Sequence, residues 1–255
     1  MPSHEHMHEN HVIPQPLAQL KEAPLDVYPD CDPALLNGSS DCLLLLLYPD
    51  RIDILNWKKQ TTNSVHIGNE FQAAIRSRAP AGKILPFRTG FLILESQLTS
   101  PLFVDAKLQS PPTAMREKLE GLPLPEPGTN AFLMKNGRFF DFEYVSQIAL
   151  AVIDTSQKLQ VGSSGTLVTA DKLVGGTFWY ADSTFYTSSP SATGENDQIL
   201  KFRYFGDSIL FQASRPVEGQ ILDLTVADLN QDHVKELVVT SINSRGIFME
   251  ATDLF

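Results

Sequence analysis

The sequence lacks the local patterns of the commonest catalytic sites. It contains no Gly-x-Ser-x-Gly turn, no phosphate-binding loop and no His-Glu-x-x-His helix. Its longest apolar run, residues 42–48, is far shorter than the roughly 20 residues that a membrane-spanning helix needs. The sequence therefore supports no catalytic residue, no cofactor-binding residue and no transmembrane segment.

Basic charge is also scarce. Twenty Lys and Arg residues stand against 30 Asp and Glu residues, which gives a formal net charge of −10. Binding to a phosphate backbone requires a basic face, so this balance argues against a general nucleic-acid-binding protein. We therefore expect no nucleic-acid partner.

Cysteine is limited to Cys31 and Cys42, and no Cys-x-x-Cys motif is present. A zinc ribbon or a dithiol redox site is thus not supported. The two cysteines flank a loop that contains Pro, Asn, Gly and Ser. They either form a disulfide that closes this loop, which would imply an oxidising compartment, or remain two buried thiols. Both alternatives stay open.

The N-terminus carries an unusual histidine tract. His4, His6, His8 and His11 are four of the six histidines in the chain. Such a tract binds zinc or copper loosely, or it belongs to a disordered tail or a tag. The first eight residues are polar throughout, so no secretory signal is visible and a cytoplasmic location stays open. We expect residues 1–24 to be a flexible tail and residues 25–255 to form a single domain.

The overall composition favours an all-β fold. Fifteen Gly, seventeen Pro and only 20% charged residues suit many short strands joined by turns better than long solvated helices. A chain of 255 residues buries one sizeable core, and all-β domains of this size are commonly single.

Residues 222–249 carry the most specific pattern in the chain. An alternating apolar strand leads into an oxygen-rich loop, and a second apolar strand, a polar turn and a third strand follow. Side chains at alternate loop positions converge on one centre, as a hard cation requires. The predicted Ca²⁺ ligands are the side chains of Asp228, Asn230, Asp232 and Glu236 and the carbonyl of Val234.

This order of strand, acidic loop, strand, turn and strand resembles the FG-GAP repeat of integrins, also called the VCBS repeat. That repeat forms one blade of a β-propeller, and the family usually has Gly where this chain has Gln231 and His233. The resemblance implies a structural calcium ion. It also implies an extracytoplasmic or cell-surface protein that binds a protein or glycan partner.

Hairpin patterns recur along the chain, as further blades require. The clearest covers residues 131–142, where Asn136 and Gly137 separate two apolar strands, because this pair favours a two-residue hairpin turn. With roughly 40–50 residues per blade, we expect a β-propeller of about five short antiparallel blades, with six as the alternative. The expected strands are 43–48, 51–57, 91–95, 131–135, 138–143, 148–153, 199–205, 208–213, 222–227, 236–241 and 246–250.

Three further local features are expected. The five consecutive leucines at 43–47 need neighbouring blades on both faces, since alternation would otherwise place two or three of them in water. Residues 25–28 are expected to close the ring by completing the last blade. Residues 113–121 are expected to form a short surface helix.

The expected function is that of a non-enzymatic interaction or scaffold module, by analogy with the resembled family. The alternative is a carbohydrate-binding or glycoside-processing propeller with carboxylates and aromatic side chains at the mouth of a central channel. The sequence leaves the partner's identity and the oligomeric state open. The candidates for that channel are Asp53, Asp105, Asp141, Trp57, Trp179, Tyr180 and Tyr186.

Overall fold

The structure is a computed structural model, and nearly all of what it describes is β-structure. It describes nineteen strands in five antiparallel sheets and one short 3-10 turn, Asn69–Phe71. No helix among the described residues is long and apolar enough to span a membrane. The described residues are 14–31, 41–74, 82–95, 97–115, 130–133, 139–142, 150–153, 178–181, 184–189, 196–205 and 208–255.

Four of the five sheets are made of strands that follow one another in the chain. The first contains β2 (Asp26–Asp30), β3 (Leu43–Tyr48), β4 (Arg51–Asn56) and β5 (Thr61–His66). The second contains β6 (Gly82–Phe87), β7 (Gly90–Glu95), β8 (Leu102–Asp105) and β9 (Thr113–Ala114). The third contains β10 (Asn130–Leu133), β11 (Phe139–Phe142) and β12 (Leu150–Ile153). The fourth contains β13 (Phe178–Ala181), β14 (Thr184–Ser189), β15 (Gln198–Phe205) and β16 (Ser208–Pro216).

The fifth sheet joins the two ends of the described chain. Its order is β1-β19-β18-β17, so β1 (Gln15–Leu20) pairs with β19 (Gly246–Asp253). The other two strands are β17 (Gln220–Ala227) and β18 (Glu236–Asn243). The prediction that residues 25–28 close the ring was wrong, because these residues lie in the first blade and β1 completes the last one. Residues 15–20, which were expected in the flexible tail, therefore form a strand of the propeller.

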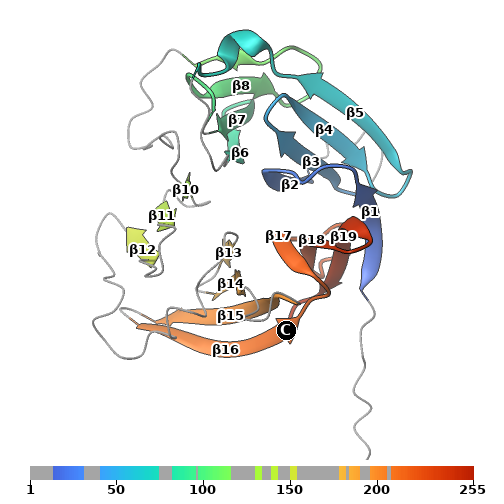
Figure 1. Cartoon of the computed structure of the whole chain (residues 1–255), viewed down its shortest axis with the longest axis vertical. Coiled ribbons are helices and arrows are strands. Elements are labelled where there is room, and N and C mark those ends of the chain that lie inside the picture. Colours follow the sequence, from blue (N-terminus) through green and yellow to red (C-terminus); the bar gives the residue numbers. More distant parts are fainter. Residues whose placement is uncertain are drawn as a thin grey trace, which may run out of the picture.

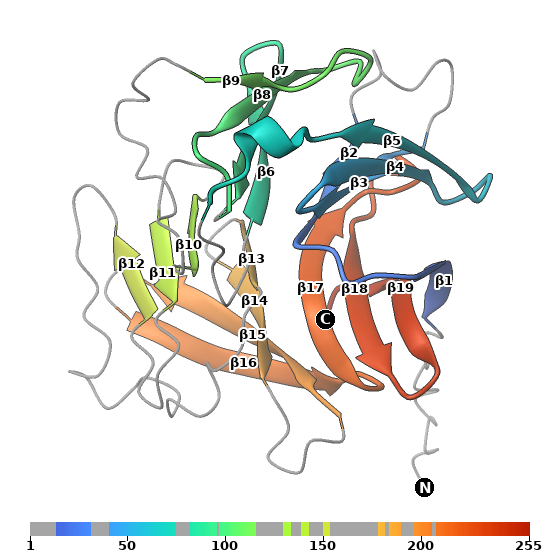
Figure 2. The same cartoon turned by 45° about the horizontal axis from the view of Figure 1, so that its top comes forward.

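The five sheets are the blades of a propeller. Figure 1 shows them arranged around a common centre, with β2, β6, β10, β13 and β17 innermost, and Figure 2 shows the same ring tilted. Around this ring β17 contacts β2, β2 contacts β6, β6 contacts β10, and β13 contacts β17. The prediction of an all-β propeller is confirmed, with five blades.

The leucine strand β3 is covered on both faces, as predicted. Leu44 and Leu46 belong to a core shared with the fifth blade, which contributes Val238 and Met249. Leu45 and Leu47 belong to a second core, shared with β6 to β8 of the second blade. Successive side chains of a strand point to opposite faces, so one run of leucines fills both cores.

All eleven predicted strands are found within three residues of their expected bounds, but the first residues of the predicted helix form a strand instead. Thr113 and Ala114 form the edge strand β9, which pairs with Leu102 and Phe103 of β8. Residues 116–121, the rest of the predicted helix, lie outside the described residues, as do Asn136 and Gly137. The strands on either side of that pair, β10 and β11, are antiparallel partners.

The turn between β18 and β19 has the chemistry that its sequence suggests. Asn243 pairs with Gly246 across the hairpin, and the Asn243 side chain accepts a hydrogen bond from the backbone N–H of Arg245 at 2.8 Å. Gly246 has a φ of +139°, which side chains of L-residues rarely tolerate. An Asn that caps its own turn and a Gly at a positive φ together define this hairpin.

Cys31 and Cys42 form a disulfide, which settles the alternative that the sequence left open. The bond links the segment after β2 to the start of β3. The backbone carbonyl of Cys42 also accepts a hydrogen bond from the indole N–H of Trp57 at 2.9 Å. Trp57 is therefore a buried part of the interblade core and not a side chain at the channel mouth.

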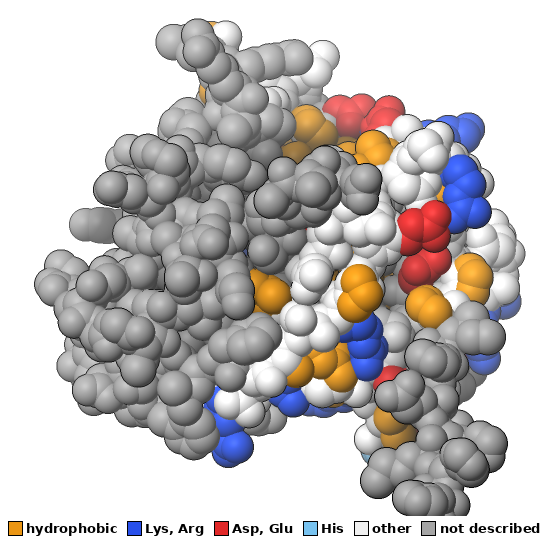
Figure 3. All heavy atoms as spheres, turned by 60° about the horizontal axis from the view of Figure 1, so that its bottom comes forward, with side chains coloured by type: hydrophobic (Ala, Val, Ile, Leu, Met, Phe, Trp, Pro, Cys, Tyr) orange, Lys and Arg blue, Asp and Glu red, His pale blue; other side chains and the backbone are white. Residues whose placement is uncertain are grey.

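Few large hydrophobic side chains are strongly exposed on the described surface. Val234 and Leu254 are the large hydrophobic residues with substantial exposure among the described residues. On the face shown in Figure 3, acidic and basic side chains lie beside one another over the described part.

Leu46→Ala should destabilise the protein strongly. Leu46 is 2% exposed in the core between the first and fifth blades, and removing such a side chain costs about 2–5 kcal/mol of unfolding free energy. Chemical denaturation monitored by tryptophan fluorescence measures this. Val234→Ala is the control, because Val234 is 58% exposed and its truncation should change stability by less than about 0.5 kcal/mol. Equal effects of the two substitutions would contradict the two-sided burial of β3.

Candidate functional site

Three charged side chains meet where the innermost strands of three blades come together. Asp223 lies on β17, Asp26 on β2 and Lys83 on β6, and these strands are consecutive neighbours around the ring (Figure 2). We call these three residues the axial trio. Asp26 is 2% exposed and Asp223 is 5% exposed, so two carboxyl groups are buried on strands that contact each other.

Asp26 is held by two donors from the neighbouring blade. Its Oδ1 lies 3.1 Å from the Lys83 ammonium, and its Oδ2 accepts a 2.8 Å hydrogen bond from the backbone N–H of Ile84. An ion pair and a backbone donor compensate a buried negative charge. Asp26 therefore fastens β2 to β6.

Asp223 is compensated less well. Its Oδ2 is buried, and no donor among the described residues reaches it. Burial raises the pKa of Asp223 well above its ordinary value, and the negative charge of Asp26 raises it further, while the Lys83 ammonium opposes both. A buried carboxyl group without a donor favours its neutral form.

Lys83 is the most exposed member of the axial trio. Its side chain is 30% exposed, whereas both carboxylates are almost completely buried. Burial alone would lower the pKa of Lys83, but the charges of Asp26 and Asp223 and the hydrogen bond to Asp26 leave it raised. Lys83 is therefore a cation that is accessible from one side and anchored on the other.

Of the three carboxylates that the sequence suggested for a channel, the two that the structure describes lie elsewhere. Asp53, on β4, accepts hydrogen bonds from Arg51 and Ser64. Asp105 accepts the backbone N–H groups of Lys107 and Ser110, so it caps the turn after β8. The side chain of Asp141 lies outside the described residues.

Of the suggested aromatic side chains, those that the structure describes are also structural. Tyr186 is buried between the fourth and fifth blades, packs edge-on against Phe255 and donates its hydroxyl to the Phe255 carbonyl at 3.1 Å. Trp57 lies in the core described above. The side chains of Trp179 and Tyr180 lie outside the described residues.

One signal for the axial trio was present in the sequence. Leu25-Asp26-Val27 and Leu222-Asp223-Leu224 both place an acid between apolar residues, and both fall in the first strand of a blade. A buried strand position rarely carries a carboxylate without a reason. Lys83 carries no comparable signal, because its partners come from strands far away in the chain.

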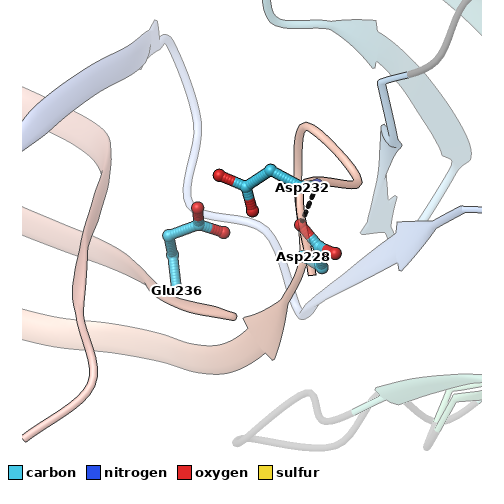
Figure 4. A group of neighbouring side chains, drawn as sticks. All are labelled: Asp228, Asp232 and Glu236. Carbon is cyan, nitrogen blue, oxygen red and sulfur yellow. Dashed lines mark hydrogen bonds between the residues drawn. The ribbon is translucent and has the colours of Figure 1, made fainter. Parts of the chain in front are cut away.

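The predicted calcium loop does bring its acidic residues together. One side-chain oxygen each from Asp228, Asp232 and Glu236 lies within 4.8 Å of the others, in the loop between β17 and β18 (Figure 4). The Asn230 side chain donates to Asp232 Oδ2 at 3.2 Å, so it joins the same cluster. The cluster contains four of the side chains predicted as ligands, and the carbonyl of Val234 remains a predicted ligand.

The loop backbone adopts a tight turn with two residues other than glycine at positive φ. Gln231 and His233, which occupy the positions where the resembled family usually has Gly, have φ values of 55° and 72°. The Asp228 carboxylate accepts the backbone N–H groups of Asp232 at 3.0 Å and His233 at 2.7 Å. These hydrogen bonds hold the left-handed residues in place without an ion.

The charges of the loop have different surroundings. The backbone N–H of Val234 lowers the pKa of Asp232, and hydrogen bonds from neighbouring loop groups lower it further. Partial burial raises the pKa of Glu236, and the negative charges of Asp232 and Asp228 add to this. Glu236 Oε2 accepts the backbone N–H of Leu229 at 3.2 Å. A cation bound between the three carboxylates would relieve their mutual repulsion.

The loop is also docked onto the first blade. The Leu229 carbonyl accepts the backbone N–H of Cys42 at 2.8 Å, and the Leu229 side chain is 3% exposed. The Cys42 sulfur lies 3.1 Å from the Asp228 carbonyl; as part of a disulfide it has no proton to donate, so this is a close contact only. The acidic loop and the disulfide thus meet at the junction of the last and first blades.

Fold and charges together define a five-bladed β-propeller with an ionisable centre. No known protein family matches the sequence, and no curated protein matches it. Solved structures of two glycosidases have a similar fold. The GH43_1 enzyme from Xanthomonas citri has a TM-score of 0.53 and 9% identity, over 96% of this chain and 91% of that chain. The RS223 β-xylosidase has a TM-score of 0.52 and 7% identity, over 95% of each chain.

This likeness contradicts the prediction of a non-enzymatic scaffold module. The similar structures are glycosidases, and one of them is a complex of the Xanthomonas citri enzyme with xylotriose. At 7–9% identity the likeness establishes the fold alone. The resemblance of residues 222–249 to the FG-GAP repeat, and the calcium ion that it implies, stay predictions.

Calcium should raise the melting temperature if the acidic loop holds an ion, because a ligand that binds only the folded state stabilises it by about 2.7 kcal/mol at 100 times its Kd. Melting curves with calcium and with chelator measure this. Asp232→Asn should abolish the difference, since it removes a charge and keeps an oxygen for the Val234 N–H. Glu218→Gln, an exposed acid paired with Arg245, is the control. Coincident curves with calcium and with chelator would exclude the site.

Asp223 should make stability depend on pH. The folded protein keeps a proton on Asp223 at pH values where the unfolded chain, with an ordinary pKa near 4, has lost it. Over that window, above about pH 4, the unfolding free energy should fall by about 1.4 kcal/mol per pH unit as pH rises. Asp223→Asn removes this contribution, so the variant should gain stability relative to wild type as pH increases. Parallel stability profiles from pH 4 to 8 would contradict the raised pKa.

Proposed function

We propose that this chain is a carbohydrate-processing β-propeller whose sugar ligand binds at the axial trio. The observation that carries the proposal is the meeting of two buried carboxyl groups with a partly exposed lysine on the innermost strands. Clustered buried acids are costly to a fold, so they commonly mark functional sites. The fold likeness to glycosidases supports a glycan as the ligand class.

The chemistry of the trio suits a sugar. Carboxyl groups and an ammonium are donors and acceptors for hydroxyl groups, and glycosidases use paired carboxyl groups in different protonation states. The surroundings of Asp26 and Asp223 differ in a related way: Asp26 has two donors, and Oδ2 of Asp223 has none among the described residues. With one cation and two acids, the trio has no excess of positive charge that would select an anionic ligand.

We further propose an extracytoplasmic location. The disulfide between Cys31 and Cys42 supports this, because disulfides persist mainly in oxidising compartments. A glycan is the partner that the fold favours, and nothing in the described structure adds support for a protein partner.

Xylo-oligosaccharides are the first ligands to test, since a structural neighbour binds xylotriose. The folded protein should bind xylotriose, and it should hydrolyse a chromogenic β-xyloside. Asp26→Asn and Asp223→Asn should each lower kcat/KM at least 100-fold, the usual scale for removing a catalytic acid or base. Asp105→Asn is the matched control, because Asp105 caps a turn away from the trio, and it should retain the activity.

Two outcomes would contradict the proposal. One is a folded wild-type protein that neither binds nor cleaves xylosides or a broader glycan panel. The other is activity that survives both axial substitutions at the level of Asp105→Asn, because the trio would then be structural. Circular dichroism and melting curves of each variant separate loss of function from loss of fold.

A further inference from the structure

Asp26 and Asp223 differ in their hydrogen-bond donors, and this difference indicates which of the two carboxyl groups carries a proton. Lys83 Nζ lies 3.1 Å from Asp26 Oδ1, and the backbone N–H of Ile84 lies 2.8 Å from Asp26 Oδ2. Asp223 Oδ2 has no donor among the described residues, although it is buried. Where two acids are close and one has all the donors, the other carries the proton.

We propose that Asp223 meets the ligand as a neutral carboxylic acid that donates a hydrogen bond, while Asp26 meets it as a carboxylate that accepts one. A sugar hydroxyl is both acceptor and donor, so one hydroxyl group bridges the pair. The ligand class is therefore a neutral polyol, and Lys83 acts as a positioning residue that keeps the negative charge on Asp26. This inference rests on the proposed function.

The surroundings of Asp223 support the assignment from each side that the structure describes. Asp26 on β2 and Lys83 on β6 are the charged groups that act on it. On β18 its cross-strand partner is Thr240, which is neutral. The next residue, Leu224, points to the opposite face of β17 and packs there with Tyr186 of β14. Burial and the Asp26 charge keep the pKa of Asp223 raised, in agreement with the geometry.

The assignment predicts a pH dependence of ligand binding. Xylotriose should bind while Asp223 holds its proton, and its affinity should fall at least tenfold once Asp223 ionises. Two anions would then face the hydroxyl, which has only one proton to donate. The affinity for xylotriose should therefore fall as the pH rises.

The decisive variant is Asp223→Asn. An amide keeps the shape of the side chain, still donates a hydrogen bond and cannot ionise. The variant should therefore bind xylotriose with an affinity that changes less than threefold over the pH range in which the wild type loses binding. Asp223→Leu, which has no donor, should bind at least tenfold more weakly at every pH.

Lys83→Met tests the positioning role. The Lys83 charge favours ionisation of Asp223, so its removal should move the midpoint of the binding profile to higher pH. A lysine with a merely structural role would change the affinity without moving the midpoint, and that result would overturn its part in the proposal.

An infrared measurement tests the proton without any ligand. At neutral pH the wild-type protein should show the carbonyl band of a protonated carboxylic acid, and Asp223→Asn should lose that band. The control is Asp30→Asn, which changes a different buried acid, on β2, and should keep the Asp223 component of the band. Absence of the band, or its survival in Asp223→Asn, overturns the inference even if sugars bind. If the band behaves as expected but no glycan binds, the proposed function fails while the proton assignment stands.

Discussion

The first blade of this ring has two apolar faces, and each face is buried only because another blade lies against it. β3 shows the constraint most clearly, because Leu44 and Leu46 need the fifth blade and Leu45 and Leu47 need the second. A blade at the end of an open row would leave one apolar face in water, so only a closed ring covers both faces of each blade. β1 provides that closure by pairing with β19, and Leu17 of β1 enters the same core as Leu46.

Ring closure also brings charges together that the chain keeps far apart. Asp26 and Asp223 occupy corresponding strands at opposite ends of the sequence, and closure makes those strands neighbours. Lys83 then reaches Asp26 from the next blade. A buried acid with no donor within the described residues opposes folding, so its presence at the centre of the ring points to a ligand and not to stability.

The acidic loop and the axial trio are sites of different kinds. The loop of Asp228, Asp232 and Glu236 is satisfied largely by its own backbone, and it fastens the last blade to Cys42 of the first. A cation there would serve the architecture. In the axial trio, Asp223 Oδ2 has no donor among the described residues, and the trio lies on the strands that meet at the centre, where ligand chemistry on a propeller is best placed.

The sequence by itself determined the local structure of this protein. Short-range patterns of side chains predict the apolar strands, the turn at Asn243 and Gly246, the acidic loop and the need of the leucine strand for cover on both faces. The structure confirms these features.

Short-range patterns misplaced the closing strand, because Gln15–Leu20 has no strong alternation of its own and is a strand only through its pairing with β19. They also pointed to Asp53 and Asp105, whose carboxylates serve nearby side chains and turns. Only the tertiary structure decided which acids are functional candidates, because the surroundings of Asp26, Lys83 and Asp223 are made by three blades that meet when the ring closes.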